Sequence, residues 1–234
     1  MATGTEPAVE IVDLAQTPLR ELNARLHEAD GAPRRWRVEN PGGRHAIAVG
    51  LDAPLEVDVD GHVGYYCAGM NQHAVVRVHG NCGVGVAENI LSGTVIVEGN
   101  ASQSAAATGR GGLVVIRGDA SSRCGISMKG VDIVVRGSVG HMSAFMAQKG
   151  CLLVCGDAGD ALGDSIYEAR LYVRGAVAGL GADCVEKELR GEHVAELRAL
   201  LERGGVTGAN PAEFRRYGSA RRLYNFNVDH VGEY

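Results

Sequence analysis

The sequence predicts an all-β protein, a right-handed parallel β-helix with seven coils of 19 residues each. The first observation is a glycine that recurs at a strict 19-residue interval, at Gly61, Gly80, Gly99, Gly118, Gly137, Gly156 and Gly175. The second is that Val, Ile or Leu stands two and four residues before each of these glycines. The third is that a small residue stands three and seven residues after each one.

The repeat has a direct physical interpretation. Two aliphatic residues at a spacing of two lie on one face of a β-strand, so each repeat should contribute one short strand. The glycine that follows permits a positive φ or a close backbone approach, and the small residues beyond it indicate tightly packed coils. A single coil cannot bury its own apolar face, so the coils should stack in register. A period of 19 residues does not fit the hexapeptide repeat of left-handed helices, and parallel connections prefer the right hand.

The alternation within each strand predicts which side chains face outward. The third residue before each glycine should point away from the core, and these residues are Asp58, Arg77, Ile96, Val115, Val134, Leu153 and Tyr172. The last five are apolar and would form an exposed stripe. We expect the chain's own C-terminal helix to cover it, and the alternative cover is a partner subunit or another copy of this chain. The residues directly before the glycines are Asp60, His79, Glu98, Arg117, Arg136, Cys155 and Arg174, which we expect to lie in solvent or to meet acidic groups of a partner.

The segments on either side of the repeat divide the chain into 1–50, 51–186 and 187–234. The first should be a cap with a strand at Val9–Leu14 and a helix that Thr17 caps, with Pro18 at its first position, running to about Asp30 and stopped by Gly31. Further strands are expected at Trp36–Val38 and His45–Val49, around a turn at Pro41–Gly43. These elements should seal the first coil.

The third segment should contain two helices and an extended arm. Val194, Leu197, Leu200 and Leu201 have helical spacing, and Gly204 and Gly205 should end that helix. Asn210, Pro211 and Glu213 indicate the start of a second helix that closes near Gly218. The alternation from Tyr224 to Val228 predicts an extended arm.

Composition restricts the class of protein. The net charge of −5 with mixed signs offers no basic face for nucleic acid, and no apolar run approaches the length of a membrane span. Residues 1–10 lack the basic start and apolar core of a secretory signal, so a cytoplasmic location is expected. In that compartment the cysteines should be free thiols. They are Cys67, Cys82, Cys124, Cys151, Cys155 and Cys184.

We find no set of residues that predicts catalysis, cofactor binding or metal binding in this chain. Cys151 and Cys155 form a C-x3-C pair without the second pair that metal sites usually show, and both should face away from the core. The eight histidines have no ligand spacing. The G-x-x-G-x-G pattern from Gly80 to Gly85 follows the repeat and does not open a helix, so a structural role is favoured over phosphate binding.

The coil signature Gly-x2-Gly-x3-small, in Gly61, Gly64 and Ala68 and again in Gly80, Gly83 and Ala87, resembles the GXGXG-type β-helix domain of the glutamate synthase large subunit. The resemblance covers about residues 55–184, and the signature is shared with the β-helix subunit of formylmethanofuran dehydrogenase. Together with the tail from Tyr217 to Tyr224, the chain is most similar to the stand-alone β-helix subunit of N-methylglutamate synthase.

The resemblance implies a non-catalytic scaffold in a hetero-oligomer. Its partners would be an amidotransferase-like subunit and an FMN-binding, glutamate-synthase-like subunit, with FMN and an iron–sulfur cluster expected in a partner and not in this chain. The complex would make N-methylglutamate from glutamate and methylamine. The alternatives are a β-helix subunit of another such complex, or a stand-alone enzyme acting on carbohydrate. The latter needs paired acids, and Asp60 and Glu98 are the candidates, two coils apart.

Overall fold

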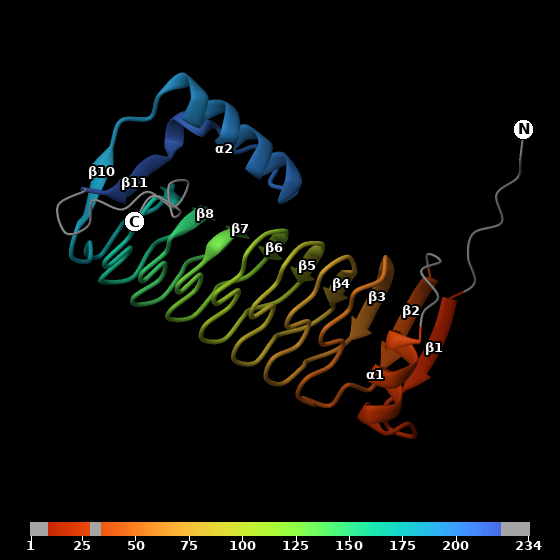
Figure 1. The fold of residues 1–234 in the computed structure, drawn as a ribbon. Coiled ribbons are helices and arrows are strands. Elements are labelled where there is room, and N and C mark those ends of the chain that lie inside the picture. The colour runs from red at the N-terminus through yellow and green to blue at the C-terminus, as the bar shows by residue number, and fades with distance from the viewer. Residues whose placement is uncertain (1–8, 29–33, 221–234) are drawn as a thin grey trace, which may run out of the picture.

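The computed structural model describes residues 9–28 and 34–220, and within them the chain forms a β-solenoid with two α-helices (Figure 1). The N-terminal elements are β1 (Val9–Asp13), α1 (Leu19–His27) and β2 (Arg34–Glu39). The repeat supplies β3 (Leu55–Asp60), β4 (Val75–Val78), β5 (Thr94–Val97), β6 (Leu113–Ile116), β7 (Lys129–Val135), β8 (Lys149–Val154) and β9 (Arg170–Val173). The C-terminal elements are β10 (Cys184–Lys187), α2 (Gly191–Arg203), a 3₁₀ turn (Pro211–Glu213) and β11 (Arg215–Ser219).

The strands of the repeat pair in parallel and in the predicted register. Val114 lies opposite Ile133 and Val115 opposite Val134, so that equivalent residues of adjacent coils are 19 positions apart. The same offset holds for the pairs from β3 to β9, except that Lys129 at the start of β7 lies opposite Lys149, before a register shift. The coils therefore stack as a rod, seen from the side in Figure 1. The predicted β-solenoid with a 19-residue repeat is confirmed.

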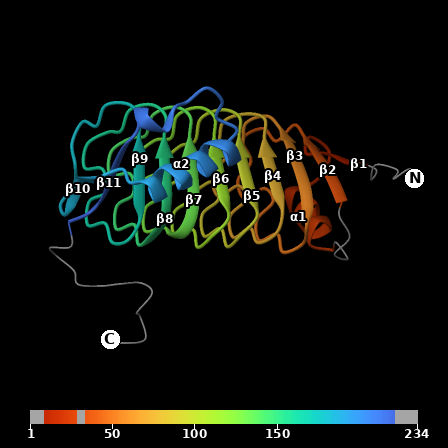
Figure 2. The same cartoon turned by 90° about the horizontal axis from the view of Figure 1, so that it is seen from above.

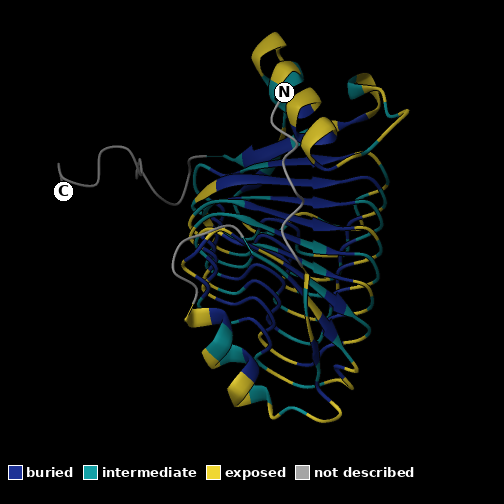
Figure 3. Ribbon diagram, turned by 90° about the vertical axis from the view of Figure 1, so that its right-hand side faces the viewer, coloured by how far each residue is buried: buried dark blue, intermediate teal, exposed yellow. Residues whose placement is uncertain are grey.

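The interior of the rod is a continuous apolar core. The aliphatic residues two and four before each repeat glycine are buried there, for example Val95 and Val97 on β5 and Ile133 and Val135 on β7. Figure 3 shows this burial along the strands and the exposed outer side of the helices. Because identical or similar side chains stack along the axis, each coil completes the core of its neighbours.

The arcs between the strands contain residues with positive φ, which the repeat pattern predicts only in part. In six successive coils the fifth, seventh and ninth residues after the glycine have positive φ, as in Ser104, Ala106 and Thr108 at about 55–60°. The seventh residue points into the core and is fully buried where it is alanine. The small residues at this position thus serve both tight packing and a left-handed conformation, which costs a non-glycine residue free energy.

The repeat glycines are required by close approach between coils. A Cβ atom on Gly137 would lie 2.7 Å from the carbonyl oxygen of Gly118, closer than real Cβ contacts. Of the seven, all within the described residues, Gly61 alone has positive φ (138°). Gly137 therefore does not need glycine for a positive φ. It needs glycine because the backbone of the preceding coil leaves no room for a side chain.

The N-terminal segment continues the sheet. β1 pairs in parallel with β2, and β2 with β3, so two further strands precede the first repeat, with α1 in the connection between them. α1 follows Pro18 at the N-cap and ends at His27, earlier than the predicted Asp30. Gly31 lies outside the described residues. The strand predicted at His45–Val49 is wrong, because Ala46 and Ala48 have φ of 56° and the segment forms an arc like those of later coils.

Helix α2 covers the outer face of the middle and C-terminal coils (Figure 2). Its side chains Leu197, Leu200 and Leu201 form a second apolar cluster with residues of the predicted stripe. Within that stripe Val115 is 3% exposed, and Val134 and Leu153 are fully buried, so the predicted cover by the chain's own helix is confirmed. Arg136 donates to the carbonyl oxygen of Gly204 at 3.1 Å and so caps the C-terminus of α2.

The segment after α2 differs from the prediction. Asn210 accepts a hydrogen bond from the backbone of Ala212, as expected of a helix cap, but only a 3₁₀ turn follows. Residues 215–219 then form β11, which pairs antiparallel with both β9 and β10 and makes the 11-stranded sheet of the described residues mixed. Tyr217 is the reason, because its side chain enters the core at the end of the rod. The predicted arm from Tyr224 to Val228 lies outside the described residues.

Candidate functional site

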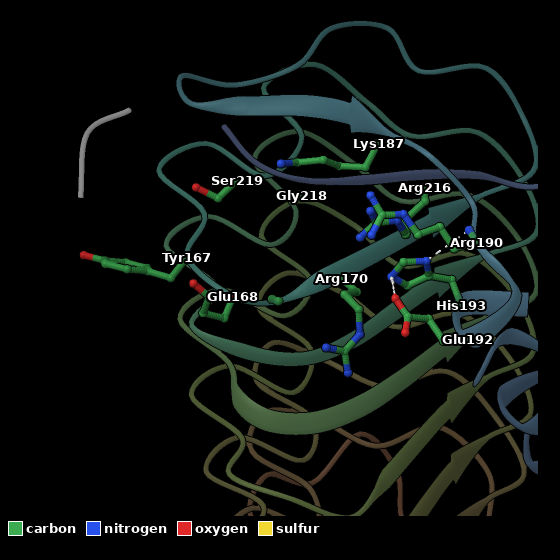
Figure 4. A pocket seen from close by; sticks show the side chains of 11 residues that line it. Tyr167, Glu168, Arg170, Lys187, Arg190, Glu192, His193, Arg216, Gly218 and Ser219 are labelled. Carbon is green, nitrogen blue, oxygen red and sulfur yellow. Dashed lines mark hydrogen bonds and ion pairs between the residues drawn. The ribbon is translucent and has the colours of Figure 1, made fainter. Parts of the chain in front are cut away.

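The candidate site is a cavity of about 440 Å³ at the C-terminal end of the rod, between β9, β10, β11 and the start of α2 (Figure 4). It forms because β11 is inserted between β9 and β10, which brings the end of the hairpin beside the residues that precede β9. Four of the residues that line it are arginine or lysine: Arg170, Lys187, Arg190 and Arg216. Glu168 and Glu192 line it too, so the cavity combines four cationic side chains with two carboxylates.

One of these cations is neutralised by helix α2. Arg170 donates from Nε and Nη2 to the carboxylate of Glu196, with distances of 2.8 Å and 2.7 Å to its two oxygens. The hydroxyl of Tyr172 donates to the same carboxylate. Burial opposes the ionisation of Glu196, but the hydrogen bonds from Arg170 and Tyr172 outweigh it and lower its pKa. This pair fixes the first half of α2 against β9.

The N-terminus of α2 forms another wall. His193 accepts a hydrogen bond through Nδ1 from the backbone N–H of Arg190 at 3.1 Å, which satisfies a donor at the helix start. Burial, and then the charge of Arg216, lower the pKa of His193. His193 is therefore neutral at pH 7 and acts here as a cap.

The remaining cations come from β10 and β11. Lys187 and Arg216 lie directly opposite each other in the antiparallel pair, so both side chains emerge on the same face of the sheet. The Nε of Arg216 donates to the carbonyl oxygen of Glu188 at 2.9 Å. Arg190 pairs with the carboxylate of Glu188 at 3.0 Å. Among the described residues, neither Lys187 nor Arg216 has a carboxylate partner.

The sequence-based candidates lie elsewhere. Cys151 and Cys155 face away from the interior core, as predicted, and are buried in the outer cluster beneath the C-terminal segment. Burial, and then the nearby Glu196 carboxylate, raise the pKa of Cys151. Burial also raises the pKa of Cys67 and of Cys124 to about 12. The cysteines are free and buried, so at neutral pH they are protonated thiols.

The acids considered for carbohydrate chemistry are held in ion pairs. The carboxylate of Asp60 forms an ion pair with Nε of Arg37 at 2.6 Å. The carboxylate of Glu98 forms one with Nη1 of Arg117 at 2.7 Å. His79 contacts Asp58 at 2.7 Å. Among the residues directly before the glycines, Cys155 is buried, so the expectation that it meets solvent or a partner is wrong. Arg174 is exposed, as expected, and also contacts Glu213, whereas Arg136 is half-buried and contacts Gly204.

The glycines in the segment from Gly80 to Gly85 are required by the backbone structure. Cβ atoms on Gly80 and Gly83 would lie 2.5 Å and 2.6 Å from the backbone of the preceding coil, and Gly85 has φ of 73°. Among the described residues, no group of three His, Cys, Asp or Glu side chains could hold a metal ion. In the same part of the chain, neither helix is long and apolar enough to cross a bilayer.

Comparison with known proteins shows a strong relation over the full length. The chain is 62% identical over 226 residues to Protein GlxC of Rhizobium meliloti (strain 1021), covering 96% of this chain and 99% of the relative. The chain belongs to the GlxC family. No family model matches it.

Sequence reasoning missed the cationic cavity of this GlxC-family chain. Its lining residues are dispersed between residues 167 and 219 with no regular spacing. They meet because β11 forms a strand where a helix was predicted. The alternation of Arg215, Tyr217 and Ser219 with Arg216 and Gly218 was the one available signal for that strand.

Proposed function

We propose that this chain is a non-catalytic scaffold subunit of a glutamate-synthase-like enzyme complex, and specifically of N-methylglutamate synthase. The observation that carries the proposal is the seven-coil solenoid with the Gly-x2-Gly-x3-small signature in register. The 62% identity to Protein GlxC, over 96% of this chain, supports a role shared with that protein.

The state of the reactive groups favours a scaffold. The cysteines are buried as thiols, and the acids on the outer face of the early coils are bound to arginines. Groups in such environments are poorly suited to act as nucleophiles or general bases. The rod is held by hydrogen bonds between every pair of neighbouring coils, which suits an element that keeps two partners at a fixed separation.

The exposed apolar side chains indicate where a partner would bind. Tyr65, Tyr66 and Met70 are each 49% exposed on the arc of the first coil, and Leu91 is exposed on the next. Large apolar side chains are enriched in protein interfaces. The partners proposed are an amidotransferase-like subunit and an FMN-binding subunit, and the latter would hold FMN and an iron–sulfur cluster.

The test is purification of the native complex through a tag on this chain, followed by identification of the other chains. We expect an amidotransferase-like chain and a flavin-containing chain in fixed ratio, with formation of N-methylglutamate from glutamate and methylamine. The double variant Tyr66→Ser/Met70→Ser should lose partners, whereas Arg198→Gln on α2 should keep them. Recovery of the chain alone, or N-methylglutamate formation by the isolated chain, would contradict the proposal. Glutamate formation from glutamine and 2-oxoglutarate without methylamine activity would favour a glutamate synthase.

A further inference from the structure

The cavity at the end of the rod contains two like charges in an unfavourable arrangement. Lys187 on β10 and Arg216 on β11 are direct cross-strand partners, a geometry that places Cβ atoms about 5 Å apart. Like charges directly opposite each other destabilise a sheet. The register therefore places two positive side chains on the same face of the sheet, at the wall of the cavity.

Two of the nearby carboxylates, Glu196 and Glu188, are bound to other arginines, whereas Glu168 and Glu192 also line the cavity. Glu196 binds Arg170, and Glu188 binds Arg190. Arg216 uses its Nε for the carbonyl oxygen of Glu188, and among the described residues its two Nη atoms have no hydrogen-bond partner. Burial is the main cause that lowers the pKa of Arg216; the charges of Arg190 and Arg170 add to it, while Tyr172 and Glu192 act in the opposite direction.

We propose that this cavity binds a small dicarboxylate, with one carboxylate on the guanidinium of Arg216 and the other at the ammonium of Lys187. The planar guanidinium matches a carboxylate with two parallel hydrogen bonds, and lysine supplies a point charge for the second. The cavity volume of about 440 Å³ lies within the usual range for small-molecule sites. Ala169 and Gly218 provide apolar wall for a short carbon chain, and the N-terminus of α2 adds a favourable dipole.

The first experiment is calorimetric titration of the full chain with succinate, acetate and inorganic phosphate at low ionic strength. We expect saturable binding of succinate at one site, at least tenfold weaker binding of acetate, and displacement of succinate by high phosphate because both are anions. This test needs no partner subunit, so it is independent of the proposed assembly.

Variants connect the binding to the two cations. Arg216→Gln and Lys187→Gln should each weaken succinate binding at least tenfold. Arg198→Gln is the matched control, an exposed arginine of α2 outside the cavity, and should bind as the unmodified chain does. Lys187→Glu should abolish binding and also raise the melting temperature of the free chain, because it replaces the like-charge pair by an ion pair with Arg216.

The Lys187→Glu variant tests the proposal even where the glutamine variants fail to fold. A lower melting temperature for Lys187→Glu would show that the two cations are not in conflict, and would overturn the argument. Linear titration without saturation, equal affinity of all variants, or binding of phosphate without succinate would also overturn it.

Discussion

Asn100 accepts a hydrogen bond through its side-chain oxygen from the backbone N–H of Asp119 in the next coil, at 2.8 Å. Asp119 does the same for Ser138, and Ser138 for Asp157. This ladder lies directly after the repeat glycines, where the approach of the coils leaves no room for a Cβ atom. Side chains with a short acceptor therefore connect the coils by hydrogen bonds next to a position of close backbone approach.

Asn100→Ala removes one step of this ladder. We expect the free energy of unfolding to fall by about 1 kcal/mol, because the N–H of Asp119 loses its acceptor and must rely on water. Asn100→Ser is the matched control, since Ser138 fills the same role through its hydroxyl, and should cost less than half as much. Urea unfolding followed by circular dichroism measures both, and equal losses would contradict a role for the hydrogen bond.

Gly137→Ala should destabilise the chain by about 1–3 kcal/mol, as overpacking does, because the new methyl group meets Gly118 and Asp119. Gly191→Ala is the control, because no atom lies within 4 Å of the added carbon there and alanine suits the first turn of α2. Melting temperatures of the two variants should therefore shift in different directions or by very different amounts. A loss for Gly137→Ala no larger than that for Gly191→Ala would contradict the close approach.

Leu197→Ala should reduce the free energy of unfolding by about 2–5 kcal/mol, the usual cost of removing a buried leucine side chain. The loss would come from the outer cluster that α2 forms over Val134 and Leu153. Arg198→Ala, one position along on the exposed face of the helix, should change stability by less than about 0.5 kcal/mol. Thermal unfolding with and without a dye that binds apolar surface would show whether α2 detaches before the solenoid melts.

Cys124 should make stability depend on pH in the alkaline range. Its thiol has a pKa raised by burial from 9.0 to about 12, so it ionises near pH 9 only after unfolding. The contribution of the protonated Cys124 thiol to the free energy of unfolding is complete below pH 9. It is lost as pH rises from about 9 to about 12, at about 1.4 kcal/mol per pH unit. Cys124→Ala should be less stable at pH 7 but show a correspondingly shallower decline between pH 9 and 10. Parallel stability curves for the two chains would contradict the burial of this thiol.

The candidate cavity shows where sequence reasoning ends. Nothing about the spacing of Lys187 and Arg216 predicts that they are neighbours, since the pairing of β10 with β11 places them together. The same stretch around Asn210 and Glu213 has a sound local signal for a helix, and the cap forms as expected. The helix does not continue, because the open edge of β9 offers backbone partners and the end of the core accepts Tyr217.

The sequence by itself determined the solenoid, its register and the direction of the side chains on each strand. A 19-residue repeat fixes the register because every aliphatic pair and every glycine must meet its equivalent in the next coil. The apolar stripe at Val115, Val134 and Leu153 also indicated that another part of the protein covers these side chains.

Only the tertiary structure decided that the N-terminal strands extend the sheet and that the arcs contain residues with left-handed backbone conformation. It also decided that β11 closes the far end beside a cationic cavity. Those outcomes depend on which sheet edges and core positions remain open once the coils have stacked, and local patterns carry no information about them.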